Sequence, residues 1–227
     1  MLFRSEINNG YAATYPLPSL PMGWSQNRFC TGIGGYTVNT CFSPVTAWDR
    51  AGAASAFPTC SPRTGNTMLR FNSYSIFSGE KAYTSTRKLD ISTVGANSPT
   101  GSIWMYRDND AAWLTSLDSI SIYVSNSPIV NATMVNISNS NPRPYNAGTA
   151  TTANTWYQIN FTVPNAVIAS WAATGMYIII MGSSADGNNI YLDDFSIQEY
   201  PATSQAFVAS SAALTYQNSA TTAPSAL

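Results

Sequence analysis

Two segments near the end of the chain decide the fold: MYIIIM at residues 176–181 and NIYLDDFSIQEY at residues 189–200. The first is apolar on both faces of an extended chain, which is typical of a central strand that is covered on both sides. The second closes the predicted domain and carries two adjacent carboxylates, Asp193 and Asp194. Between the two segments lies Asp186-Gly187, a dipeptide that favours positive φ angles and predicts a hairpin turn.

From residue 67 onward the chain repeats one pattern, short apolar or β-branched runs separated by Asn, Gly, Ser and Pro. In SISIYV, residues 119–124, every second side chain is apolar, as in a half-buried strand. One segment, residues 165–173, has a weakly amphipathic pattern, and we interpret it as a turn or a single helical turn. The predicted strands are residues 67–75, 80–88, 101–107, 119–124, 132–137, 155–163, 176–181 and 189–200. This series without a strong helix predicts an all-β fold, an antiparallel jelly-roll β-sandwich.

The composition narrows the possible functions. Charged residues make up 9% of the 227 residues, against about 25% in an average protein, and the net charge is −1. The sequence therefore lacks the basic surface that nucleic-acid binding needs, and it has no apolar run of about 18 residues that could span a membrane. Histidine is absent, which excludes Ser-His-Asp triads and histidine-ligated zinc. Aromatic residues at 12% argue against intrinsic disorder.

Three segments are expected along the chain: an N-terminal segment with a truncated start (1–17), the sandwich (18–200), and a linker with the start of a further truncated module (201–227). No apolar stretch of signal-peptide length follows Met1. Taken as a start codon, Met1 would indicate a cytoplasmic protein. We interpret both ends instead as cuts from a longer chain.

The three cysteines, Cys30, Cys41 and Cys60, lie in the first third of the chain. An odd number cannot pair completely. In an oxidising compartment one disulfide, Cys41–Cys60 or Cys30–Cys41, would leave one thiol over, and otherwise all three are unpaired. Of the two pairings, we predict Cys41–Cys60.

Several motifs occur in an order known from one family. IWMYR (103–107) precedes LDSISIYV (117–124), and YIIIMG (177–182) precedes NIYLDDF (189–195). This order resembles the MAM-type jelly roll, in which "SFW-x-Y", "D-x-L-x-V-Y-V" and "I-x-L-D-D-I" strands recur.

The sequence resembles more closely the MAM-like, choice-of-anchor modules of secreted Bacteroidetes proteins. Their "LP-x-GW" opening matches LPMGW (20–24), and their later motifs match Trp48, PTCSP (58–62) and MLRFNSY (68–74). The resemblance covers about residues 18–200. It implies an extracellular or cell-surface module without catalytic activity, placed beside proteases, glycosidases or adhesin repeats in proteins that often use type IX secretion.

The paired aspartates of the closing segment are the strongest metal candidate. Neighbouring residues of a strand face opposite sides, so one carboxylate points toward the sandwich and the other away from it. A buried carboxylate is costly without a partner, and Ca²⁺ takes six to eight oxygen ligands. We therefore expect a structural Ca²⁺ held by Asp193 or Asp194 with Glu6, Asn72 or a loop carbonyl. Hydrogen bonds from loop amides, or a pair with Arg70, would satisfy the same carboxylate.

Two loops carry further carboxylates. Asp108 and Asp110 flank an asparagine in a loop that is either solvated or a contact for a second ion or a glycan hydroxyl. Residues 186–189, DGNN, predict a turn first and a metal ligand second. Adjacent strand carboxylates diverge, and nothing marks an apolar pocket around residues 108–110, so neither pair fits the carboxylates of a glycosidase. No catalytic site is expected.

Carbohydrate sites of β-sandwiches use exposed aromatic faces with amide and carboxylate partners. Trp156 opposes the apolar face of the segment 155–163 and is therefore the best exposed candidate. Trp104 and Tyr177 are assigned to the core. The candidate ligand-binding residues are Trp156, Trp113, Tyr106, Tyr145, Asp108 and Asp110.

Three functions fit these observations. The first is a non-catalytic extracellular module for adhesion or carbohydrate binding, whose partners are a glycan or an extracellular protein and the other domains of its parent chain. The second is an ancillary domain that packs on a secreted peptidase or glycoside hydrolase. The third is an independent enzyme, which the absence of a catalytic constellation disfavours.

Overall fold

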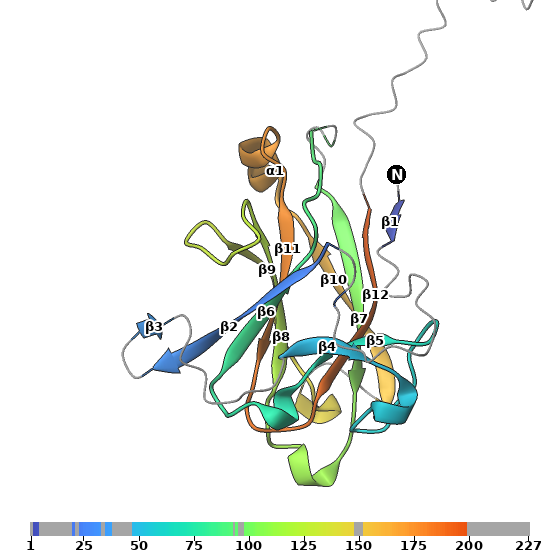
Figure 1. Cartoon of the computed structure of the whole chain (residues 1–227). Coiled ribbons are helices and arrows are strands. Elements are labelled where there is room, and N and C mark those ends of the chain that lie inside the picture. Colours follow the sequence, from blue (N-terminus) through green and yellow to red (C-terminus); the bar gives the residue numbers. More distant parts are fainter. Residues whose placement is uncertain are drawn as a thin grey trace, which may run out of the picture.

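The computed structural model describes residues 2–4, 20, 23–32, 35–37, 47–92, 94, 98–147 and 152–198. Within this part of the chain two antiparallel sheets lie face to face, and the only α-helix stands at one end of the sandwich (Figure 1). The strands are β1 (Leu2–Arg4), β2 (Ser25–Gly32), β3 (Gly35–Thr37), β4 (Trp48–Ala51), β5 (Met68–Phe71), β6 (Lys81–Ser85), β7 (Thr100–Arg107), β8 (Ser119–Ser125), β9 (Val135–Pro142), β10 (Thr155–Thr162), β11 (Tyr177–Ser183) and β12 (Ile190–Gln198). The helix is α1 (Asn165–Trp171), and short 3-10 turns are η1 (Ala53–Ser55), η2 (Ser73–Ser75), η3 (Ala111–Trp113) and η4 (Tyr145–Ala147).

Each sheet has six strands. The first runs β10-β7-β12-β5-β4, with β1 paired to β12, and the second runs β3-β2-β6-β11-β8-β9. The predicted all-β antiparallel sandwich is thereby confirmed. Each of the eight predicted strands overlaps an observed one, and β1 to β4 come from the first third of the chain.

The connection between β11 and β12 differs from the prediction. These two strands belong to different sheets, so residues 184–189 cross from one layer to the other rather than closing a hairpin. Asp186 does have the positive φ of 60° that the dipeptide favours. The turn chemistry was therefore predicted correctly and the pairing was not, because a local dihedral does not determine which sheet the next strand joins.

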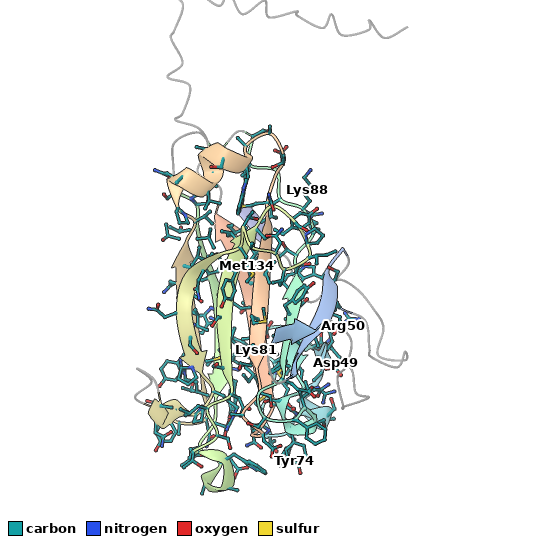
Figure 2. All side chains as sticks on the ribbon, turned by 90° about the vertical axis from the view of Figure 1, so that its left-hand side faces the viewer. Asp49, Arg50, Tyr74, Lys81, Lys88 and Met134 are labelled. Atoms are coloured by element: carbon teal, nitrogen blue, oxygen red, sulfur yellow. The ribbon has the colours of Figure 1, made fainter. Side chains whose placement is uncertain are left out.

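The main core lies between the sheets and is built from the inward-facing residues of both. On β11, Ile178 and Ile180 enter this core, whereas Ile179 joins Tyr83 in a separate cluster on the other face of the sheet. The segment after β8 covers that second cluster with Met134, which Figure 2 shows lying across the sheet. A strand that is apolar on both faces is thus covered on both faces, as its sequence predicts.

Helix α1 has seven residues, so it is longer than the single turn expected from the sequence. Its buried residues, Val167 and Ile168, extend the core at this end of the sandwich. In the described part of the chain, no helix has the length and apolar character needed to cross a membrane.

Candidate functional site

The end of the sandwich opposite α1 contains an ion cluster that is almost completely shielded from water. The side chain of Arg143 is 0% exposed, and its Nη1 lies 2.5 Å from Oδ2 of Asp108. Its Nε lies 3.2 Å from Oδ2 of Asp118, whose side chain is also 0% exposed. The remaining nitrogen, Nη2, donates to the carbonyl oxygen of Trp113 at 2.7 Å. Because removing one partner would leave a buried charge uncompensated, this buried ion cluster fixes the loops that it joins.

Asp118 also holds the crossing between β11 and β12. Its Oδ1 accepts hydrogen bonds from the backbone N–H groups of Ala185 at 2.7 Å and Gly187 at 3.2 Å, and from the hydroxyl of Ser73. A Cβ atom at position 187 would lie 2.0 Å from Oδ2 of Asp118, so only glycine fits there. The crossing, η2 and the start of β8 are therefore connected through one carboxylate.

Three aromatic side chains stand in a row at this end. Phe57 and Tyr74 are 46% and 49% exposed, with ring centroids 5.1 Å apart. Tyr74 contacts Trp113 edge to face at 5.9 Å. We call Phe57, Tyr74 and Trp113 the aromatic row, and Figure 2 shows Tyr74 at the end of the sandwich away from α1.

The aromatic row is attached to the polar structure beneath it. The side chain of Asp110 accepts a hydrogen bond from the N–H of Ala112 at 3.1 Å and so caps η3, which carries Trp113. The side-chain oxygen of Asn189 accepts the N–H of Tyr74 at 3.2 Å. Two of the three aromatic residues thus stand on backbone that polar side chains hold in place.

A second aromatic cluster lies on the outer face of the first sheet, and residues 52–67 cover it. Tyr106 and Trp156 contact each other at 5.6 Å, and the indole N–H of Trp156 donates to the carbonyl of Ser61 at 3.3 Å. The hydroxyl of Tyr191 bonds both backbone groups of Phe57, at 2.6 and 3.1 Å. We call this group the covered cluster. Its members are Ala51, Ala56, Cys60, Met68, Tyr106, Trp156 and Tyr191.

Trp104 lies on the same outer face, and its assignment to the core was wrong. It is half-buried and pairs with Asp193 across the sheet, while the guanidinium of Arg63 stacks 3.8 Å from its ring centroid. The inward positions of β7 belong to Ile103 and Met105. Both faces of this strand carry large apolar residues, so alternation alone did not reveal which face was inside. Tyr177, the other residue assigned to the core, is likewise half-buried.

The paired aspartates sit at an irregularity of β12. The pairing with β7 shifts between Asp193 and Ser196, and Asp194 has a positive φ of 46°. Oδ2 of Asp193 accepts the backbone N–H groups of Arg63 at 2.8 Å and Thr64 at 3.2 Å. Burial raises the pKa of Asp193, and these amide donors oppose that rise. Asp194 pairs with the side chain of Arg63.

The four residues predicted as calcium ligands are not gathered around one point by the contacts of the described residues. Asn72 donates to Oδ2 of Asp49 at 3.3 Å, and Glu6 lies outside the described residues. Arg70 pairs with Asp49, at 2.6 Å, and not with Asp193 or Asp194. In the described ranges no group of three or more Asp, Glu, Cys and His side chains is arranged to hold a metal ion. Loop amides, the alternative weighed from the sequence, are the partners that Asp193 has.

Cys60 carries a free, buried thiol, so the pairing expected at this residue is not made. Its sulfur lies 3.7 Å from that of Met68 within the covered cluster. Burial, followed by the charges of Asp108 and Asp193, raises the pKa of the thiol to about 12. Cys41 lies outside the described residues.

A groove of about 690 Å³ runs between β9 and β10, the edge strands of the two sheets. Its lining is polar and offers amide groups to hydroxyl-bearing ligands. The lining residues are Asn136, Ile137, Ser138, Asn139, Asn141, Gln158, Ile159 and Asn160. None of them was singled out from the sequence as a ligand-binding residue, since asparagines in edge strands give no distinctive pattern.

The predicted ligand-binding residues separate into two regions. Trp113 belongs to the aromatic row, whereas Tyr106 and Trp156 belong to the covered cluster. Asp108 is part of the buried ion cluster, and Asp110 caps η3. Tyr145, in η4, is half-buried and joins neither region through a described ring contact.

Phe57 and Tyr74 were not expected at the site. Tyr74 falls in the segment predicted as one strand, residues 67–75, which ends in the structure at Phe71 and continues as η2. The sequence Asn72-Ser73 before it was the available signal for this break, because both residue types favour turns. Phe57 reaches Tyr74 only through the packing of residues 52–67 on the sheet.

Comparison with solved structures places the chain among known β-sandwich modules. The K2 cleaved adhesin domain of Lys-gingipain aligns with a TM-score of 0.53 at 13% identity, over 87% of this chain and 99% of that domain. The K1 cleaved adhesin domain of Lys-gingipain from Porphyromonas gingivalis aligns with a TM-score of 0.50 at 15% identity, over 88% and 99%.

The same fold also occurs in a cyclase from Fischerella sp., with a TM-score of 0.53 at 11% identity, over 87% of this chain and 95% of that one. No family model and no curated protein matches the sequence. These similarities show the fold, a β-sandwich, and a fold shared by adhesins and a cyclase does not by itself determine function.

Proposed function

We propose that the chain is a non-catalytic extracellular module for adhesion or carbohydrate binding within a larger secreted or cell-surface protein, and that the aromatic row is its binding surface. The observation that carries the proposal is the series of ring contacts Phe57–Tyr74–Trp113, in which Phe57 and Tyr74 are exposed. The carbonyl of Trp113 is held by Arg143 of the buried ion cluster. Aromatic side chains supply large, rigid contact area at a low cost in conformational entropy. A series of neighbouring rings offers apolar surface to the flat faces of successive sugar rings.

The polar neighbours of the aromatic row suit a hydroxylated ligand. Asp110 is partly exposed beside Trp113, and exposed amides lie farther along the sandwich in the groove between β9 and β10. The buried ion cluster keeps the backbone beneath Trp113 in one position before a ligand arrives. Such preorganisation reduces the ordering cost that binding would otherwise include.

Three further observations support an extracellular module. The gingipain domains of the same fold are adhesins. The charged content of 9% leaves Ser, Thr, Asn and Gln to provide the polar surface. The motifs quoted above resemble MAM-like, choice-of-anchor modules, which implies a parent protein with further domains and a glycan or surface protein as partner.

A second candidate function is docking to a neighbouring domain of the parent chain, such as a peptidase or glycoside hydrolase. The loops at the same end of the sandwich expose two large apolar side chains, Phe77 at 58% and Leu117 at 55%. Contiguous exposed apolar surface often marks protein contacts, whereas single exposed apolar side chains are common. Docking would use these residues together with the aromatic row.

The test is a glycan array with the wild-type chain, followed by calorimetry with the strongest glycan. Tyr74→Ala and Trp113→Ala are each expected to weaken binding by about tenfold or more, because a tenfold loss is about 1.4 kcal/mol and truncating an aromatic hot-spot residue costs about 2 kcal/mol or more. Phe77→Ala is the matched control, an exposed aromatic outside the row, and should bind normally.

Two results would contradict carbohydrate recognition by the aromatic row. One is unchanged affinity in both Tyr74→Ala and Trp113→Ala. The other is a chain that binds no glycan on the array, which would favour the docking function.

A further inference from the structure

One side of the sandwich is bounded by β9 and β10, the terminal strands of the two sheets. The groove between them has a volume of about 690 Å³, within the range of about 300–1,000 Å³ that is typical of small-molecule sites. None of its lining residues is charged, and two of them, Ile137 and Ile159, belong to the main core or pack against it. The groove therefore combines apolar surface with neutral polar groups.

Some of the polar lining residues shape β9 itself. The pairing of β9 with β8 shifts register on both sides of Ile122. There the hydroxyl of Ser138 accepts the N–H of Ile122 at 2.8 Å, and the side-chain amide of Asn141 donates to the carbonyl of Asn139 at 2.7 Å. Irregularities of this kind redirect side chains and are frequent beside binding sites. Ser138 and Asn141 thus hold the wall of the groove in shape.

Three other amides of the lining are available to a ligand. The side chains of Asn139, Gln158 and Asn160 are exposed, and among the contacts of the described residues none of the three makes a hydrogen bond. Gln158 and Asn160 are two positions apart on β10, so they leave the same face of the strand about 7 Å from each other. An amide both donates and accepts hydrogen bonds, and so does a sugar hydroxyl.

We infer that this groove is a second carbohydrate site, in which Asn139, Gln158 and Asn160 bond the hydroxyl groups of a neutral oligosaccharide and the two isoleucines contact its rings. A charged sugar would lose hydration there without gaining a counter-charge from the lining. The inference rests on the proposed carbohydrate function, but the aromatic row contributes no lining residue to the groove. We expect a Kd of about 1 mM, because each neutral hydrogen bond is worth only about a factor of five in affinity.

An added polypeptide strand is the competing occupant of such a place. The edge of a sheet presents backbone groups to which an extended chain can pair. Strand addition would use the backbone of one edge, and β9 is irregular over the part that faces the groove. The available amides come instead from both walls, Asn139 from β9 and the other two from β10. This arrangement favours a ligand that bonds side chains across the groove.

The experiment is an NMR titration of the isotope-labelled chain carrying Tyr74→Ala and Trp113→Ala, in which the aromatic row is disabled. The probes are the neutral β-1,4-linked hexasaccharides of glucose, xylose, mannose and galactose, with hexagalacturonate as the charged counterpart. At least one neutral sugar should shift the side-chain NH₂ signals of Asn139, Gln158 and Asn160, with a Kd of about 1 mM. Hexagalacturonate should leave these signals unchanged.

Variants of the lining test the assignment in the same background. Gln158→Ala and Asn160→Ala combined should weaken binding of that sugar by about tenfold or more, since two hydrogen bonds are lost. Asn146→Ala is the matched control, because it removes an exposed amide in η4, away from the groove, and should bind like its parent. Circular dichroism establishes that each variant is folded.

Wild type is titrated in parallel, so that the amides of the groove and the indole N–H of Trp113 report on the two sites separately. The inference is overturned if no neutral hexasaccharide shifts the groove amides at about tenfold above the expected Kd, or if the Gln158→Ala, Asn160→Ala variant keeps full affinity. It is also overturned if only hexagalacturonate, or only a peptide of alternating Thr and Lys, shifts them. Groove shifts without any change at Trp113 would support this site and contradict the aromatic row.

Discussion

The aromatic row and the covered cluster contain the same kinds of side chain but differ in what lies over them. In the covered cluster, residues 52–67 contribute Cys60 and Ala56 and bond the indole of Trp156. In the aromatic row, the rings of Phe57 and Tyr74 are nearly half exposed. Arg143 of the buried ion cluster holds the backbone of Trp113 from the inner side. The difference shows that an outward-facing aromatic residue is available to a ligand only where the chain itself does not cover it.

The largest expected effect comes from removing Arg143, the cation of the buried ion cluster that holds the backbone of Trp113. Arg143→Met should lower the free energy of unfolding by about 3–5 kcal/mol, because it leaves the buried carboxylates of Asp108 and Asp118 without a counter-charge. Denaturant unfolding measures the change. Arg63→Met is the control, since its pair with Asp194 is partly solvent-exposed and should contribute at most about 1 kcal/mol. Similar losses for the two variants would contradict the difference between the regions.

Cys60 reports on whether the covered cluster is closed. A thiol whose pKa is raised to about 12 stays protonated as pH rises through the ordinary thiol range near 9.0. At about pH 8 its thiolate fraction is therefore about a thousandfold lower than in the unfolded chain, and alkylation should slow at least that much.

Mass spectrometry of the Cys60 peptide after iodoacetamide treatment gives the alkylation rate. The unfolded chain is the control and should react at the rate of a free thiol. Because the unfolded state alone loses this proton between about pH 9 and pH 12, the thiol also makes stability fall as pH rises through that window. Rapid labelling of the native chain at about pH 8 would show that residues 52–67 open readily.

The two tryptophans should differ in what they contribute to stability. Trp156→Ala should cost about 2 kcal/mol, since the indole packs on the covered cluster and bonds the backbone of Ser61. Trp113→Ala should cost about 1 kcal/mol or less, because its described ring contact is the edge of Tyr74. Thermal or denaturant unfolding compares them, and a greater loss for Trp113→Ala would reverse the assignment of the two regions.

The smallest effect is expected at the irregularity of β12. Asp194→Gly removes a partly exposed ion pair with Arg63 and at the same time relieves a positive φ of 46°. The two contributions are each about 0.5–1 kcal/mol and of opposite sign. The net change in unfolding free energy should lie close to zero, with Asp194→Ala, which loses the pair and keeps the strain, as the less stable control. Equal stability of the two variants would argue against strain at this position.

The strands could be predicted because their signal is local. Alternation in residues 119–124 and the two-sided apolar run at 176–181 specify extended, buried chain without reference to the rest of the molecule. The pairing of β11 and β12 with different sheets could not be predicted, because a turn sequence does not say where the following strand goes. Trp104 was misassigned because both faces of β7 are apolar.

The site was predicted only in part for a related reason. Trp113 was found because it lies in a loop after a charged turn, which is a local feature. Tyr74 and Phe57 join Trp113 through contacts between distant parts of the chain. Trp156 is covered by the segment around Ser61, about 95 positions away. Coverage by a distant loop leaves no pattern in the sequence around the covered residue.

The most direct test of the central claim is the glycan affinity of three single variants, Tyr74→Ala, Trp113→Ala and Trp156→Ala, measured by calorimetry at a temperature where circular dichroism shows each to be folded. If the aromatic row is the binding surface, the first two lose about tenfold or more in affinity and Trp156→Ala binds like wild type. Loss of binding in Trp156→Ala with normal binding in the other two would contradict the account.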